Sequence, residues 1–140
     1  MADRTFLDWP FLDATHRALA GELDAWTGNV LPGLQIPHDF DDATLDATCR
    51  RLVASLGDAG LLGLSVPAPY GGRHEKLDVR GLCLARETLA RHHALADFSF
   101  AMQGLGSAPI SLAASDEQKR RFLPEVARGR AIAAFALSEP

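Results

Sequence analysis

Apolar residues recur through most of this chain at spacings of three and four, which is the period of an amphipathic α-helix. The first apolar stripe comprises Leu12, His16, Leu19, Leu23 and Trp26. We place the N-cap of this helix at Asp8, just before Pro10, and its end at Gly28 and Asn29. His16 could serve as a ligand, but a histidine on such a stripe is more often half-buried with one hydrogen bond, which is the interpretation we adopt.

Two more amphipathic helices follow, each preceded by a loop rich in proline and glycine. Residues 30–40 predict the first loop, and Asp41 caps the next helix. The apolar positions of that helix are Leu45, Cys49, Leu52, Val53 and Leu56. Residues 60–72 predict a second, well-packed loop, and Asp78 then caps the third helix. The apolar side predicted for the third helix comprises Val79, Leu82, Cys83, Ala85 and Leu89.

Two further helical segments are predicted before the composition changes. The segment that begins at Asp97 is apolar on most sides, which predicts a central helix, and Pro109 should kink it. Ser115–Gln118 has the form of a capping box. We expect Pro124 to break the helix that follows into two short ones, and Gly129 to end it.

The last ten residues depart from the helical pattern. Residues 131–137 are apolar without a break, and Ser138, Glu139 and Pro140 follow. A short apolar run bounded by turn residues predicts a buried strand, with strand character near residues 133–137. The predicted fold class is therefore all-α, with a helical bundle of about five helices over residues 1–130. Residues 131–140 would begin a different, strand-containing part.

Composition and charge exclude several classes of function. The chain has 140 residues, of which 47% are hydrophobic and 23% charged, and its net charge of −4 provides no basic surface for nucleic acid. No apolar run approaches the length of a membrane span, and no signal peptide is recognisable, so we expect a cytoplasmic protein. Cys49 and Cys83 lack metal-ligand spacing and are interpreted as small core residues. His92 and His93 point about 100° apart on a helix, so we expect no metal site.

Three segments together resemble the N-terminal helical domain of the flavin-dependent acyl-CoA dehydrogenase family. Residues 60–72, GLLGLSVPAPYGG, resemble a marker segment of that family. Residues 116–129, DEQKRRFLPEVARG, resemble the segment that precedes its middle domain, and residues 134–140, AFALSEP, resemble the first strand of that middle β domain. Three motifs in the family's order are more specific than any one alone, and the resemblance covers residues 56–140.

The resemblance implies that the full-length protein uses FAD to oxidise an acyl-CoA thioester at its α and β carbons. A carboxylate base would take the α-proton, and the β-hydride would pass to the flavin. By position in the motif, Phe135, Leu137 and Ser138 would bind the cofactor, with the Ser138 hydroxyl donating to a ring heteroatom. In this family the helix after Asp97 lines the acyl pocket. The candidate substrate-binding residues are Phe100, Ala101, Met102 and Leu105.

The resemblance also implies partners, and it implies what this chain lacks. Relatives pass electrons to electron-transfer flavoprotein and form homo-oligomers, dimers or tetramers. Their base belongs to a C-terminal helical domain, so Glu139 is not the base, and this chain alone should be inactive and bind FAD weakly at most. Two alternatives stay open: an acyl-CoA oxidase or flavin monooxygenase of the same superfold, and a cofactor-free helical interaction module.

Overall fold

The computed structural model describes residues 3–39, 41–136 and 138, and these residues confirm the all-α prediction. They form five α-helices: α1 (Ala14–Asn29), α2 (Asp42–Asp58), α3 (Val79–His92), α4 (Ala94–Ala113) and α5 (Asp116–Ala127). They also form four short 3₁₀ helices: η1 (Thr5–Asp8), η2 (Leu31–Leu34), η3 (Leu61–Ser65) and η4 (Ala68–Tyr70). The described residues contain no strand, only an isolated parallel bridge between Pro67 and His74.

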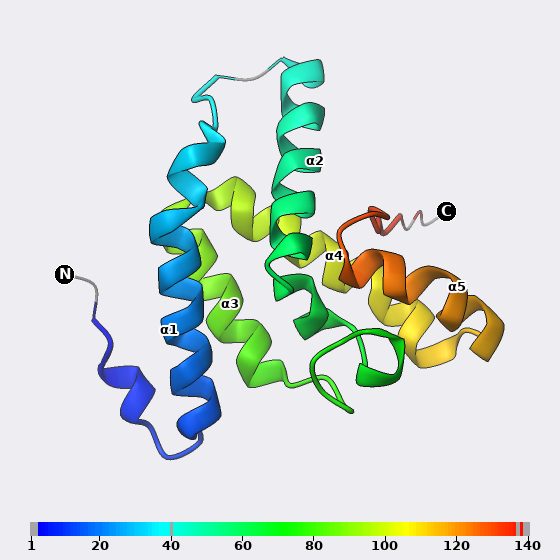
Figure 1. Ribbon diagram of the computed structural model, residues 1–140, viewed down its shortest axis with the longest axis horizontal. Coiled ribbons are helices and arrows are strands. Elements are labelled where there is room, and N and C mark those ends of the chain that lie inside the picture. The colour runs from blue at the N-terminus through cyan, green and yellow to red at the C-terminus, as the bar shows by residue number, and fades with distance from the viewer. Residues whose placement is uncertain (1–2, 40, 137, 139–140) are drawn as a thin grey trace.

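Helix α4 is the central element of the bundle (Figure 1). It packs against α3, which in turn packs against α1, and it also contacts α2, α5 and η3. Its prediction as a central helix is therefore confirmed. The helix begins earlier than expected, however, because the Nδ1 atom of His93 accepts from the Leu95 amide at 3.1 Å and caps it. Asp97, the predicted start, instead pairs with Arg86 of α3 through two contacts of 2.9 Å.

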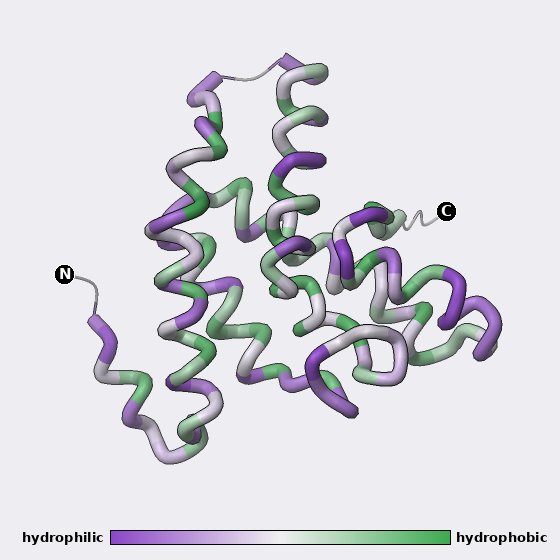
Figure 2. Tube along the Cα trace, in the orientation of Figure 1, coloured by the Kyte–Doolittle hydropathy of each residue, from purple (hydrophilic) through white to green (hydrophobic). Residues whose placement is uncertain are grey.

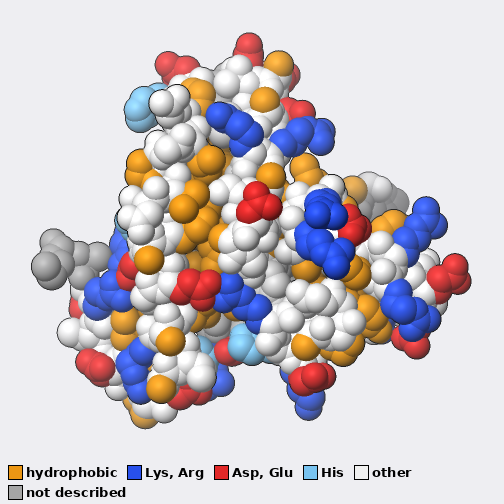
Figure 3. All heavy atoms as spheres, viewed as in Figure 1, with side chains coloured by type: hydrophobic (Ala, Val, Ile, Leu, Met, Phe, Trp, Pro, Cys, Tyr) orange, Lys and Arg blue, Asp and Glu red, His pale blue; other side chains and the backbone are white. Residues whose placement is uncertain are grey.

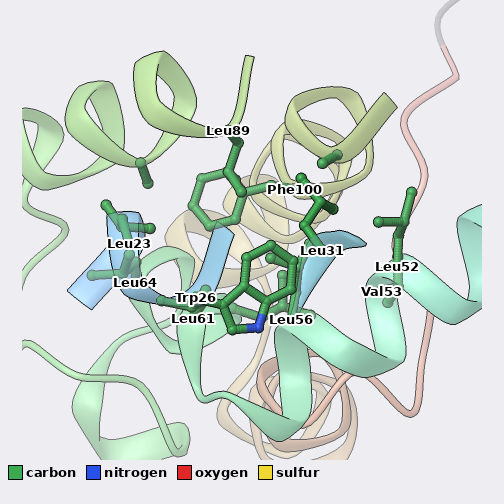
Figure 4. Close-up of a cluster of buried hydrophobic side chains, with 13 residues drawn as sticks. Leu23, Trp26, Leu31, Leu52, Val53, Leu56, Leu61, Leu64, Leu89 and Phe100 are labelled. Atoms are coloured by element: carbon green, nitrogen blue, oxygen red, sulfur yellow. The ribbon is translucent and has the colours of Figure 1, made fainter. Parts of the chain in front are cut away.

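The main core lies where α1, α2, α3, α4 and η3 meet. The ring of Phe100 is at its centre, with Leu89 and the Trp26 indole close by (Figure 4). Its other buried members include Leu23, Leu31, Leu52, Val53, Leu56, Leu61, Leu62, Leu64, Ala85 and Ala96. Hydrophobic positions accordingly alternate with polar ones along the helices (Figure 2). A second cluster joins Val66 to Leu123, Val126 and Ala127 of α5. Burying this much aliphatic surface is the principal source of stability for such a bundle.

The start of α1 differs from the prediction, because Asp13 and not Asp8 is its N-cap. The Asp13 carboxylate accepts from the amides of Thr15 at 2.9 Å and His16 at 3.2 Å. Asp8 instead ends η1, and the Trp9 ring packs edge-on against Phe11 beyond it. The predicted N-cap therefore lies five residues too early in the chain.

The interpretation of His16 as half-buried with one partner is wrong. Its side chain is only 2% exposed, and a carboxylate faces each ring nitrogen: Asp13 Oδ1 lies 2.8 Å from Nδ1 and Asp78 Oδ2 lies 2.8 Å from Nε2. Burial raises the pKa of Asp78, but hydrogen bonding from the Gly81 backbone and the charge of His16 together bring that pKa below its ordinary value. His16 thus links the N-terminal ends of α1 and α3.

The buried side of α3 also differs from the prediction. Val79 is 66% exposed and Cys83 is exposed, so Cys83 is not the core residue we expected. The buried positions are Gly81, Leu84, Ala85, Thr88 and Leu89. A Cβ atom at Gly81 would lie 3.4 Å from Leu19 of α1, so small residues let the two helices approach closely. Ala85 and Leu89 are buried as predicted, whereas the low hydropathy of Gly81 and Thr88 did not reveal their burial.

Helix α5 begins as predicted and continues further than predicted. Ser115 and Gln118 form the expected capping box. The Ser115 hydroxyl accepts from the Gln118 amide at 3.3 Å, and the Gln118 Oε1 atom accepts from the Ser115 amide at 3.0 Å. Pro124 does not divide the helix, because it lies in the last turn and removes a single hydrogen bond there. The Arg128 amide still donates to the Pro124 carbonyl, and Gly129 ends the helix with a positive φ of 69°.

The strand predicted over residues 131–137 is not formed among the described residues of this segment. Residues 132–136 have no regular secondary structure, and Leu137 lies outside the described residues. A strand requires a partner to satisfy its backbone groups, and no described segment provides one. The amides of Arg130 and Ala131 instead donate to the Glu125 carbonyl at 2.9 and 3.1 Å, which holds the segment against α5.

Changing Asp78 should separate the contribution of its charge from its role as a helix cap. Asp78→Ala should lower the free energy of unfolding at neutral pH by about 1–2 kcal/mol, because both the cap and the contact with His16 are lost. Asp78→Asn keeps a capping oxygen and should cost less. Because the pKa of Asp78 is depressed below 3.8, the stability from its charge is present above that pH and is lost as pH falls through the folded pKa.

Urea unfolding at neutral pH and near pH 3 would measure these differences. The Asp78→Asn difference from wild type should shrink at the lower pH. Asp58→Asn, an exposed position at the end of α2, is the control. Equal pH dependence in the two asparagine variants would contradict the role assigned to the Asp78 charge.

The close crossing of α2 and the turn after α5 gives a second prediction. A Cβ atom at Gly57 would overlap the Arg128 carbonyl, which is backbone and cannot rotate away. Gly57→Ala should therefore destabilise the fold by about 1–3 kcal/mol. The matched control is Gly21→Ala in the middle of α1, where nothing lies within 4 Å of the added methyl. That change should stabilise by about 0.5–1 kcal/mol. Thermal unfolding of both variants tests this, and a stabilising Gly57→Ala would be the opposite result.

Candidate functional site

Helix α4 exposes a row of apolar side chains on the face that points away from the core. Phe98 is 58% exposed and Leu105 is 50% exposed, while Ala101 and Met102 between them are half-buried. These four residues follow the spacing of one helix face, at steps of three, one and three. We call them the α4 ridge. Large apolar side chains gathered on one face of a monomer mark a surface that is covered by something else.

One hollow of about 420 Å³ lies beside the α4 ridge, toward α3. It is lined by Leu82, Arg86, Phe98, Phe100, Ala101, Met102, Gly104 and Leu105. All four predicted substrate-binding residues, Phe100, Ala101, Met102 and Leu105, are thus brought together on one wall. Phe100 differs from the others because it is only 2% exposed and belongs chiefly to the core. The pKa of Arg86, at the rim, is raised by its hydrogen bond to Asp97.

A second hollow of about 690 Å³ lies between α2, α4 and the C-terminal segment. Phe98 and Met102 line it too, so the α4 ridge separates the two hollows. Its rim carries Asp46 and Arg50, which pair at 2.8 Å. Its other lining residues are Cys49, Val53, Ser99, Gln103, Gly129, Arg130, Ile132, Ala133 and Ala134. This hollow therefore connects the ridge to the chain that leaves the helical bundle.

The predicted cofactor-binding residues follow the lining of this second hollow in the sequence. Phe135 is 44% exposed and Ser138 is exposed, whereas Leu137 lies outside the described residues. The described lining of the hollow stops at Ala134. The structure thus exposes Phe135, which directly follows the last lining residue, and Ser138 is also exposed.

Three residues of this region were not among the predicted site residues. Phe98 lines both hollows, and its position three residues before Ala101 was the signal that could have identified it. Gln103 is buried and its Oε1 accepts from the Ala133 amide at 2.8 Å. Gly106 packs against the same segment, since a Cβ atom there would lie 2.7 Å from the Ala134 nitrogen. A lone glutamine in an apolar helix was a visible signal for Gln103.

Neither the charged surface of α5 nor the metal-ligating side chains form a further site among the described residues. The basic side chains of α5 lie on the surface among acidic ones, and Arg128 pairs with Glu125 at 2.8 Å (Figure 3). No group of three or more metal-ligating side chains occurs within residues 3–39, 41–136 and 138. Among the described helices, none combines the length and the apolar character that crossing a membrane requires.

Comparison with known proteins identifies the domain. The model of the acyl-CoA dehydrogenase N-terminal domain matches residues 13–130. A probable acyl-CoA dehydrogenase of Bacillus subtilis is 42% identical over 103 residues, which cover 74% of this chain and 16% of that protein. Cyclohexane-1-carbonyl-CoA dehydrogenase of Geobacter metallireducens is 35% identical over 101 residues, which cover 70% of this chain and 26% of that protein. The chain thus spans about a quarter or less of the length of these two relatives.

A solved structure agrees with the sequence comparison. The crystal structure of an acyl-CoA dehydrogenase from Bacillus anthracis, complexed with FAD, superposes with a TM-score of 0.73 at 35% identity. The match covers 93% of this chain and 22% of that one. The helices, the order of the motifs and both comparisons agree, and the chain belongs to the acyl-CoA dehydrogenase family, of which it contains the N-terminal helical domain.

Proposed function

We propose that this chain is the N-terminal part of an FAD-dependent acyl-CoA dehydrogenase that oxidises an acyl-CoA thioester at its α and β carbons. In this proposal residues 1–130 form the helical domain and residues 131–140 begin the middle β domain. The observation that carries it is the α4 ridge, an exposed apolar face beside a 420 Å³ hollow. The names of the relatives, all acyl-CoA dehydrogenases, support the reaction class.

The α4 ridge would form one wall of the site for the acyl chain. Ala101, Met102 and Leu105 present apolar atoms to the hollow, and an alkyl chain lying against them would be shielded from water on that side. Phe100 supports this wall from beneath, because its ring fills the core. The small side chain of Ala101 leaves room at the middle of the ridge. The size of the residue there would therefore influence which acyl groups are accepted.

The C-terminal segment fits one edge of an FAD site. Phe135 presents an apolar ring to the surface, and the small side chains of Ala133, Ala134 and Ala136 allow a planar group to approach the backbone. The amides of Phe135 and Ala136 make no backbone hydrogen bond to described residues, and they are proposed to donate to the cofactor. The Ser138 hydroxyl and Leu137 are proposed to complete this edge. Bound FAD supplies the acceptor for the hydride that leaves the β carbon.

The base that takes the α-proton is proposed to lie in a later part of the protein. The described residues that line the 420 Å³ hollow include no carboxylate. The role of this chain is then to hold and desolvate the acyl group, which positions the α carbon for a base supplied elsewhere. Electron-transfer flavoprotein as the acceptor, assembly into a homo-oligomer and a cytoplasmic location stay predictions that follow from the resemblance.

The full-length protein should show the chemistry directly. Anaerobic addition of a saturated acyl-CoA thioester should bleach the absorbance of its bound flavin. Ala101→Phe should fill part of the hollow and lower kcat/KM for long acyl chains by about tenfold or more relative to short ones, since one or two lost methylene contacts have that effect. Ala90→Phe, at an exposed position of α3, is the matched control.

Two outcomes would contradict this proposal. If no acyl thioester bleached the flavin, the proposed dehydrogenase reaction would be wrong. If Ala101→Phe left the chain-length preference unchanged, the α4 ridge would not be part of the acyl site.

The isolated 140-residue chain should be inactive and should bind FAD weakly at most. A cofactor as large as FAD requires a concave site that covers most of its surface, and this chain offers one edge. The exposed Phe98, Leu105 and Phe135 should also promote self-association. Flavin absorbance after purification and mass from light scattering, with and without added FAD, would measure both properties. Stoichiometric FAD that a thioester bleaches would overturn this prediction.

A further inference from the structure

Gln103 is a polar side chain on the buried face of the central helix. Its Oε1 accepts from the Ala133 amide at 2.8 Å, and its Nε2 lies 3.4 Å from the Ser99 carbonyl. A buried amide side chain is tolerated where its acceptor and donor both have partners. The hydrogen bond to Ala133 spans 30 residues of sequence and joins α4 to the segment that leaves the bundle.

The same segment has two other attachments, and both are of a different kind. The amides of Arg130 and Ala131 bond to the Glu125 carbonyl, so that attachment is backbone to backbone. At Gly106 the attachment is steric, because a Cβ atom would lie 2.9 Å from the Ala133 Cβ atom. Among these hydrogen bonds, the one to the Gln103 side chain acts furthest along the segment, since it fixes the Ala133 amide two residues beyond Ala131.

The attachments end where the proposed flavin-facing residues begin. Phe135 is 44% exposed, and no backbone hydrogen bond joins its amide to a described residue. Residue 135 is only two residues beyond residue 133, so holding the Ala133 amide restricts where Phe135 can lie. Met102, the neighbour of Gln103, lines both hollows. One turn of α4 therefore contains both Met102 of the α4 ridge and Gln103, which binds the C-terminal segment.

We propose that Gln103 is a positioning residue that sets the path of residues 133–138 relative to the α4 ridge. The inference rests on the proposed function, in which this segment forms one edge of the flavin site. Gln103 itself touches neither flavin nor substrate. It acts through the Ala133 amide. By holding this amide, it keeps the proposed flavin edge at a constant distance from the proposed acyl wall.

Amide hydrogen exchange of the 140-residue chain, followed by NMR without any flavin, tests this proposal independently of the enzyme reaction. In wild type the Ala133 amide should exchange more slowly than the Phe135 amide. Gln103→Leu keeps the volume and removes the acceptor, so exchange at Ala133 should accelerate by about tenfold or more. Rates at Leu52 and Leu56 in α2 report any change in overall stability. Gln103→Glu restores an acceptor oxygen and should restore the protection.

The matched control is Ser99→Ala, one turn earlier on the same face. The Ser99 hydroxyl is buried and makes no hydrogen bond within the described part of the chain, so its loss should leave Ala133 protected. Equal exchange at Ala133 and Phe135 in wild type would overturn the proposal, even if Gln103→Leu failed to fold. So would full protection of Ala133 in Gln103→Leu, or release of Ala133 by Ser99→Ala.

Discussion

The packing of α4 inside the bundle is the constraint on which the rest of this structure depends. One face of the helix must fit against α2, α3, α5 and η3, and it does so with a large ring at the core and small residues at the crossings. Phe100 fills the space between the helices, while Gly106 and Ser107 let neighbouring chain approach. This packing leaves the opposite face free, and that face is apolar. Packing among the described residues does not cover this exposed apolar ridge, and in the proposed function an acyl group would lie against it.

Local signals in the sequence were sufficient for most of the helices. Spacings of three and four identified five helical segments, and the caps at Asp41, Asp78 and Ser115 were identified correctly. Side-chain acceptors within three residues of a helix start act locally, so they can be recognised without knowledge of the fold. The start of the first helix was predicted wrongly, since Asp13 and not Asp8 accepts from the first free amides of α1.

Long-range packing was harder to predict. The buried side of α3 includes Gly81 and Thr88, whose low hydropathy does not reveal their burial. The two carboxylates around His16 come from positions 13 and 78, and no pattern within one helix brings them together. The predicted strand failed for a related reason, since pairing depends on a partner that the described residues do not contain.

The candidate site combines residues found in two ways. Ala101, Met102 and Leu105 came from a resemblance to a family, and the structure brings them together on one hollow. Phe98 and Gln103 emerged only from the packing, because periodicity does not distinguish an apolar residue that lines a hollow from one in the core. In the proposed function, the helical domain supplies the acyl wall and the C-terminal segment that is attached to α4 and α5. The base that takes the α-proton would lie in a later part of the protein.

The central claim is that the α4 ridge contacts the acyl chain of the substrate. A crystal structure of the full-length protein with FAD and a non-oxidisable acyl thioester tests it most directly. The account predicts carbon atoms of the acyl chain within about 4 Å of Ala101, Met102 and Leu105, with the flavin next to residues 135–138. An acyl chain bound away from α4, with the ridge covered instead by another part of the protein, would contradict it.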